Sequence, residues 1–385
     1  MTLQAPPAPI FRRLVTGTVQ AAVEEVGGRP AMVARSVSSR RRGALSMEDG
    51  ETLRVAAASA LSFRIPMVMV LASSGADVSD GVASLHGWGQ AARALAMCSG
   101  TVPVVVVVTG PALSGPALML GIADVVVMTT DAFAFVSGPA MVEDFTGVRI
   151  GIHQLGGTSM HARSSGLCAI EAATEEDGLA HVAHLLSLLP AHADQLAPVG
   201  STGDPADRPV VELREIIPDR ATSSYDVRHV AAALSDDHDV TELWTRWSPQ
   251  LVTALGRIDG RTVGFLANQP QALAGTIDIT ASQKGARFVR FCDAFNIPLV
   301  TLVDTPGFLP GKDLEWRGMI RHGAELAFAY AQASVPRICL ILRKAFGGAY
   351  IVMDSRGIGN DICLAWPGAE VAVMGASGAA QILYR

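Results

Sequence analysis

Two kinds of glycine turn recur in this sequence, each where a predicted strand passes into a predicted helix. The first kind is SSGAD around Gly75 and TPGFLPG around Gly307, and the second is ALSGP at residues 112–116 and AFGGA at residues 345–349. A turn that opens a helix exposes backbone N–H groups at the positive end of the helix dipole, where they can hold an oxygen that becomes negative during a reaction. Each turn is therefore a candidate oxyanion hole, with tight packing of strand against helix as the alternative role of its glycines.

Side-chain motifs for other chemistries are missing from the sequence. It contains no G-x-S-x-G, Walker A or H-E-x-x-H pattern and no spaced Cys/His cluster, so we expect no side-chain nucleophile, nucleotide phosphate loop or metal site. Of the nine histidines, His161 and His322 are the most interesting, but a helix-packing or surface role is favoured for both. The five cysteines are scattered without a C-x-x-C pair, which argues against disulfides and structural zinc and indicates a reducing, cytoplasmic setting.

The glycine turns belong to an internal repeat that extends over most of the chain. The segments RIPMVMVLASSGA and NIPLVTLVDTPGF lie 232 residues apart, and TVPVVVVVTGPALSG and SVPRICLILRKAFGG lie 233 residues apart. The same offset of 232 relates GRP at Gly28 to GRT at Gly260, and it drifts only to 237 between Val136 and Val373. So small a drift over more than a hundred residues indicates a tandem duplication.

Each repeat reads as strand, glycine turn, helix, strand, glycine-rich turn, helix and a further strand. Runs such as VPVVVVV and IPLVTLV are typical of strands buried on both faces, so the pattern predicts an α/β fold. We expect an N-terminal domain at residues 1–210 and a C-terminal domain at residues 211–385. Residues 191–209, rich in Pro, Gly, Asp and Ala, are the predicted linker, and the elements of the second unit open near Tyr225.

The composition excludes several partners. Charged residues are 17% of the chain and the mean hydropathy is +0.33, so we expect much of the surface to be covered in subunit contacts. The net charge of -6, with one basic run at residues 40–42, argues against nucleic acid; this run is predicted to be solvated, or alternatively to meet a CoA phosphate. Residues 102–128 are apolar but broken by Gly, Pro and Asp124, which favours a buried βαβ unit over a membrane span, and no secretory signal is visible.

The second unit strongly resembles the carboxyltransferase β subunits of acetyl-CoA and propionyl-CoA carboxylases. The resemblance is nearly continuous from Tyr225 to Arg385 and includes GRIDGRTVGFLANQP, VDTPGFLPG, LRKAFGGAY and AWPGAEVAVMGASGA. It is weaker over residues 73–190, where it includes VSGPAMV and LGGTSMHARSSGL, and faint before residue 64. The resemblance implies two crotonase-like domains of the ClpP/crotonase type, in agreement with the duplication.

The resemblance also implies a reaction and its partners. The carboxyl group of carboxybiotin, held on a separate carrier protein, would move to the α-carbon of an acyl-CoA substrate, with backbone amides as the main catalytic groups. No A-M-K-M biotinylation site or ATP-grasp signature is present, so a biotin carboxylase and biotin carboxyl carrier subunit are expected as separate polypeptides. A homo-oligomer is expected, either a dimer or a trimer of dimers, with no metal in this chain.

Residue by residue, the resemblance places one oxyanion hole of the C-terminal unit on Gly348 and Ala349. The neighbouring residues Gly307, Phe308 and Gly347 are expected to support the bound biotin or CoA group. Tyr350 and Ile351 are expected to line the acyl pocket. Many propionyl-CoA enzymes carry Asp where this chain has Ile351, so acetyl-CoA or a broader range of substrates is predicted.

The N-terminal unit departs from the family pattern. The resemblance places the oxyanion hole of this unit on Ser114 and Gly115, and it implies that Gly75 and Ala76 bind the cofactor. Asp77 stands where the family carries Arg in S-G-G-A-R.

By the repeat, Pro116 is the counterpart of Ala349, and proline has no N–H to donate. We therefore expect the first hole to be one donor short.

Two other functions stay open at the level of sequence. One is a biotin-independent acyl-thioester decarboxylase of the same fold, which the altered first unit favours. The other is a non-catalytic paralogue subunit. Since the family usually begins with an extra helical segment and continues past the equivalent of Arg385, the chain is expected to be truncated or completed by another subunit.

Overall fold

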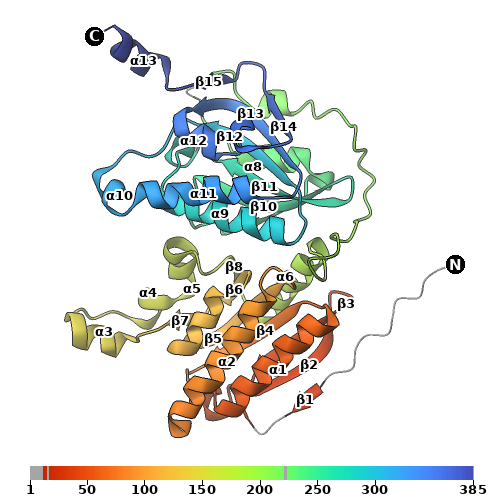
Figure 1. The fold of residues 1–385 in the computed structure, drawn as a ribbon, viewed down its shortest axis with the longest axis vertical. Helices are drawn as coiled ribbons and strands as arrows, with labels where there is room; N and C mark the ends of the chain where they lie inside the picture. Colours follow the sequence, from red (N-terminus) through yellow and green to blue (C-terminus); the bar gives the residue numbers. More distant parts are fainter. Residues whose placement is uncertain (1–11, 15–16, 221–222, 385) are drawn as a thin grey trace, which may run out of the picture. The chain divides into compact units, whose positions relative to one another are not determined.

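Two α/β units, divided between Gln195 and Leu196, make up the chain in the computed structural model, which describes residues 12–14, 17–220 and 223–384 (Figure 1). The division lies before the expected boundary at 210–211 because residues after 196 bond to the second unit. Gly200 N donates to Gly260 O at 2.7 Å, and the Arg208 guanidinium donates to two backbone carbonyls of residues 233 and 235. The proline-rich segment is therefore largely part of the second unit.

The first unit is built on a mixed sheet in the order β1-β2-β3-β4-β5-β6-β8, with β7 paired to β5. Its strands are β1 (Arg12–Leu14), β2 (Val19–Val26), β3 (Arg29–Ser36), β4 (Met67–Ser73), β5 (Val104–Leu113), β6 (Val125–Thr129), β7 (Phe133–Phe135) and β8 (Ile170–Ala172). Its helices are α1 (Met47–Phe63), α2 (Val82–Cys98), α3 (Pro139–Thr146), α4 (Ile152–Gly156), α5 (Thr158–Met160) and α6 (Glu175–Leu188), with short 3-10 turns at 41–43, 78–80 and 115–121 and a π turn at 161–165.

Both faces of this sheet are covered, which explains the continuous apolar runs in the sequence. Every residue of β4 is buried. Alternate side chains along the strands, such as Met67 and Val106, point to one face of the sheet and join the core formed with α1 and α2. Val107 points to the opposite face and packs against Gly178 of α6. Its Cγ1 atom lies 2.8 Å from where a Cβ on that glycine would sit. Alternate side chains of the parallel strands thus pack against different helices.

The second unit repeats this plan with the sheet order β14-β13-β12-β11-β10-β9 and with β15 paired to β13. Its strands are β9 (Val240–Leu243), β10 (Leu251–Ile258), β11 (Arg261–Asn268), β12 (Leu299–Thr305), β13 (Arg337–Phe346), β14 (Ile362–Ala365) and β15 (Glu370–Ala372). Its helices are α7 (Leu213–Ile216), α8 (Val227–Leu234), α9 (Ile279–Ala294), α10 (Lys312–Trp316), α11 (Met319–Gln332), α12 (Gly347–Val352) and α13 (Ala376–Leu383), with 3-10 turns at 236–238, 273–275 and 356–358.

Strand register confirms the duplication at the level of single residues. Met67 pairs with Val104 in the first unit, and Leu299 pairs with Arg337 in the second. Both ladders shift register just before the glycine turns, at Ser73 opposite Ala112 and at Thr305 opposite Ala345. The predicted α/β fold with two crotonase-like halves is thereby confirmed.

The apolar segment at residues 102–128 forms β5, a 3-10 turn and β6, as the sequence predicts. Within the described ranges of the chain, no helix has both the length and the apolar character needed to cross a membrane.

Lys284 on α9 is fully buried and gives the second unit a titratable group within its core. Its Nζ donates to Trp244 O and Trp247 O, each at 2.9 Å, and burial lowers its pKa to about 7. Between this pKa and the ordinary value of about 10.4, the unfolded chain holds the proton that the folded chain releases, so stability rises with pH.

We expect the free energy of unfolding to rise by about 2 kcal/mol from pH 7 to pH 9 because of this one group. Urea unfolding at both pH values checks this, with Lys284→Met as the control that lacks the titrating amine. An equal pH dependence in both proteins would exclude Lys284 as the source.

Candidate functional site

The AFGGA turn of the second unit joins the end of β13 to the start of α12. Gly347 has a φ of 60°, and a Cβ there would lie 3.1 Å from Val373 O, so the turn favours glycine. Gly348 and Ala349 follow in the first turn of α12, and no side chain caps their N–H groups. Since the first amides of a helix have no carbonyl partner within it, these two donors can hold an anionic oxygen.

The Gly307 turn lies directly beside this pair of amides. Thr305 pairs with Ala345 across the sheet, and two residues later Gly307 has a φ of 145°. The Phe308 ring lies 3.4 Å from where a Cβ on Gly348 would sit. The structure therefore brings Gly307, Phe308, Gly347, Gly348 and Ala349 together, as the resemblance implied.

Tyr350 and Ile351 continue α12 beyond the two amides. The Tyr350 side chain is half-buried with its hydroxyl 4.0 Å from Cys363 Sγ, and burial raises its pKa to about 12. Ile351 is 44% exposed. A large aliphatic side chain exposed one turn from the amides is consistent with contact to a bound group, but the acyl pocket itself stays a prediction.

The ALSGP turn of the first unit follows the same backbone path. Leu113 pairs with Phe135 as Phe346 pairs with Ala372, and this makes Pro116 the third residue after the strand, in the position of Ala349. Ser114 has a φ of 63°, close to that of Gly347, although a side chain is strained in that conformation. Its N–H donates to Phe135 O at 3.0 Å. Pro116 has no N–H, so Gly115 is left as the donor of this turn.

Two neighbours shape the Gly115 turn. The Trp88 indole of α2 lies 2.8 Å from where a Cβ on Gly115 would sit, and its buried Nε1 has no acceptor among the described residues. Gly75, with a φ of 106°, lies so close that a Cβ there would be 3.1 Å from Leu113 O. The structure thus brings Gly75 and Ala76 next to Ser114 and Gly115.

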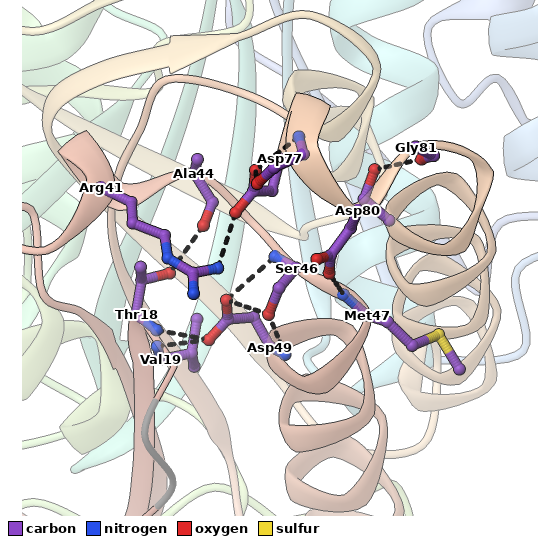
Figure 2. Close-up of polar contacts among 12 residues, drawn as sticks. Thr18, Val19, Arg41, Ala44, Ser46, Met47, Asp49, Asp77, Asp80 and Gly81 are labelled. Carbon is purple, nitrogen blue, oxygen red and sulfur yellow. Dashed lines mark hydrogen bonds and ion pairs between the residues drawn. The ribbon is translucent and has the colours of Figure 1, made fainter.

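Asp77, which stands where the family carries Arg, is paired in the structure. Figure 2 shows its carboxylate bonded to Arg41 Nη1 at 2.8 Å, and it also accepts from Ser79 N at 2.9 Å. Hydrogen bonds from Ser79, together with Arg41, hold the pKa of Asp77 below its usual range. Arg40, Arg41 and Arg42 are all exposed, as the prediction of a solvated run requires, although Arg41 pairs with Asp77 and Arg40 donates to Gly17 O at 3.2 Å.

The same view contains a second carboxylate, Asp49 of α1, which is fully buried (Figure 2). It accepts from the amides of Thr18 and Val19 at 2.6 and 2.8 Å and from Ser46 Oγ at 2.7 Å. Asp49 thereby joins the start of β2 to the N-terminus of α1. These hydrogen bonds stabilise the fold, so Asp49 is not a candidate site residue.

The histidines have the packing roles that their sequence context favours. His161 is buried between Ala134 O at 2.9 Å and Ser165 Oγ at 2.7 Å, and burial lowers its pKa. His322 is half-buried and bonded to Glu325 at 2.7 Å. Over the described ranges, no three His, Cys, Asp or Glu side chains gather in a way that could hold a metal ion.

Comparison with known proteins gives a family match over almost the entire chain. The model of the carboxyl transferase domain matches residues 8–385. The chain is 42% identical to the propionyl-CoA carboxylase beta chain of Saccharopolyspora erythraea, over 89% of this chain and 64% of that protein. It is 39% identical to the methylmalonyl-CoA decarboxylase subunit alpha of Veillonella parvula, over 85% of this chain and 64% of that protein. The chain thus spans slightly less than two thirds of the length of these relatives.

A solved structure matches both the fold and the sequence. The transcarboxylase 12S crystal structure, a hexamer with methylmalonyl-CoA and methylmalonic acid bound, has a TM-score of 0.93 and 38% sequence identity. The match covers 96% of this chain and 71% of that one.

Proposed function

The chain belongs to the carboxyl transferase domain family, and on that premise we propose that it is the carboxyltransferase subunit of an acyl-CoA carboxylase. It would move the carboxyl group of carboxybiotin, carried on a separate protein, to the α-carbon of acetyl-CoA, propionyl-CoA or a similar acyl-CoA. The observation that carries the proposal is the pair of adjacent glycine turns, with the amides of Gly348 and Ala349 at the start of a helix that no side chain caps. The propionyl-CoA carboxylase beta chain and transcarboxylase 12S, to which the chain is similar, are named for carboxylation and carboxyl transfer and support the same reaction class.

The donor set fits the chemistry that this reaction needs. Carboxybiotin would supply the carboxyl group. Negative charge would develop on the ureido oxygen as the carboxyl group leaves, and on the thioester oxygen of the substrate as its α-proton passes to the ureido group; the carboxyl group would then bond to the α-carbon in place of that proton. Gly348 and Ala349 would donate to one such oxygen in the second unit, and Gly115 to the other in the first. Donors fixed before the reaction stabilise that charge without reorganising.

The assembly that we propose is a homo-oligomer, a dimer or a trimer of dimers, that works with a biotin carboxylase and carrier subunit in the cytoplasm. Large apolar side chains are exposed on α2, on α11 and just after β15, including Val82, Met97, Ile320, Phe328 and Val373. Such side chains are typical of surfaces that another subunit covers. The transcarboxylase 12S relative is itself a hexamer.

A biotin-independent decarboxylase is the second candidate. The Veillonella relative is named as a decarboxylase subunit, and the first turn of this chain lacks the amide at Pro116. A non-catalytic paralogue is the remaining alternative. Such a subunit would show neither carboxyl transfer nor decarboxylation.

Back-transfer from malonyl-CoA to free biotin on the purified chain separates the three. A carboxyltransferase forms carboxybiotin and acetyl-CoA only when biotin is present. A decarboxylase releases CO₂ and acetyl-CoA at the same rate without biotin. A non-catalytic subunit leaves malonyl-CoA unchanged in both assays, and that result would overturn the proposal.

Ile351 yields a prediction on substrate choice. Ile351→Asp places a charge beside the acyl tail, so we expect it to weaken the use of acetyl-CoA relative to propionyl-CoA. The ratio of the two kcat/KM values measures this, and Ile351→Leu is the control that preserves the apolar character. A ratio that Asp leaves unmoved would show that Ile351 does not line the acyl pocket.

A further inference from the structure

A buried ion pair lies just before both glycine turns of the second unit. Asp304 precedes the Gly307 turn on β12, and Arg343 precedes the Gly347 turn on β13. Arg343 Nε donates to Asp304 Oδ2 at 2.8 Å, and the two side chains are only 7% and 2% exposed. Two buried charges beside the candidate donors require a physical reason, since desolvating them is expensive.

The pair fills an irregularity in the sheet. Val303 pairs with Ile341 and Thr305 with Ala345, so one residue of β12 lies opposite three residues of β13. The ladder hydrogen bonds fail in such a bulge. The Asp304 carboxylate compensates, because its Oδ1 accepts from Lys344 N at 3.2 Å while Oδ2 accepts from Arg343.

The other side of the Arg343 guanidinium is fixed as well. Nη1 donates to Arg220 O at 3.0 Å and to Ser223 O at 2.6 Å, and the guanidinium lies 4.8 Å from the centre of the Tyr225 ring. Arg343 therefore links the bulge to the segment that leads into α8. The planar fork of arginine suits this set of acceptors in a way that a lysine amine does not.

The first unit has the same bulge without the ion pair. Leu71 pairs with Val108 and Ser73 with Ala112, and the residues equivalent to Asp304 and Arg343 are Ala72 and Gly110. A Cβ on Gly110 would lie 3.1 Å from the Ala72 Cβ, so small side chains close the gap. The fold therefore does not need the ion pair in order to form the bulge.

We propose that Arg343 is a positioning residue which, through Asp304, holds the amides of Gly348 and Ala349 beside the Gly307 turn. This inference rests on the proposed function, because it assigns those amides to the reaction. The strands that leave the bulge reach the two turns within four residues, so a shift there moves the donors directly. A misplacement of about 1 Å can lower a catalysed rate about 100-fold.

The chain offers a matched control on the same strand. Arg337 begins β13 and forms a buried ion pair at 2.7 Å with Asp354, two residues beyond the C-terminal end of α12, so this pair holds the end of the helix opposite to the candidate donors. We expect Arg343→Lys to lower kcat of back-transfer by about 10- to 100-fold with KM changed less than about threefold. Arg337→Lys should lower the melting temperature similarly but leave kcat within about threefold of the parent. Equal kcat losses in the two variants would overturn the proposal.

A second measurement does not depend on activity. Amide hydrogen exchange of residues 345–349, at the start of α12, should accelerate in Arg343→Lys and remain at the parental rate in Arg337→Lys. Asp304→Asn retains an acceptor for Lys344 N but removes the negative charge, so it should accelerate exchange in the same residues. This variant replaces Arg343→Lys in the test if Arg343→Lys does not fold. Unchanged exchange in residues 345–349 of the Arg343 and Asp304 variants would overturn the positioning role. If the parent protein lacks transfer activity, the proposed function is wrong. The hydrogen-exchange measurement then still tests whether Arg343 holds the start of α12 in place.

Discussion

Ala349→Pro is expected to reduce carboxyl transfer at least about 100-fold while the protein stays folded, because it removes one donor of the second hole. The fold should tolerate the change, since Pro116 already occupies the equivalent, buried position of the first unit. A proline also fits the first turn of a helix, where its missing N–H has no intrahelical partner. The loss is therefore a loss of chemistry and not of structure.

The malonyl-CoA back-transfer assay measures this loss, with the melting temperature as the test of folding. Ala349→Gly is the control, because it changes the side chain at the same position but keeps the N–H. We expect that control to stay within about threefold of the parental rate. A folded Ala349→Pro protein that transfers at the parental rate would remove the Ala349 amide from the mechanism.

The duplicated fold could be predicted from sequence because its strands are buried on both faces. Burial on both faces leaves long apolar runs, and these can be aligned at an offset that hardly drifts, as at Arg64 and Asn296. The glycine turns were equally visible, since Gly307 and Gly347 adopt positive φ values that other residues rarely accept. The equivalence of Pro116 and Ala349 follows from the same alignment, and strand register agrees with it.

Pairings between distant charged residues could not be predicted in this way. Asp77 finds Arg41, and Asp304 finds Arg343, across 36 and 39 residues of sequence. Neither spacing has a periodic signature, because such contacts depend on which strand ends lie side by side in the folded chain. A usable signal did exist for the second pair: Asp304 and Arg343 lie in strands that are mostly apolar, and a buried charge usually has a partner.

Pro116→Ala is expected to raise transfer, by up to about 100-fold, because it restores an N–H to the weaker hole. Phe135 O already accepts the Ser114 amide, so Gly115 is the donor that this turn has without the substitution. The same change should lower stability by about 0.4–1 kcal/mol, because alanine gives the unfolded chain more freedom than proline. A gain in rate with a loss in stability cannot be explained by better folding.

Pro139→Ala is the matched control for Pro116→Ala, since it removes a proline from the start of α3 in the same unit. We expect it to leave the transfer rate within about threefold of the parent. The Pro116 and Ala349 substitutions exchange the same two chemical groups at equivalent positions of the two units, so their effects on the rate must have opposite signs. A Pro116→Ala protein that binds acyl-CoA but transfers no faster than the parent would show that the first turn does not donate through this position.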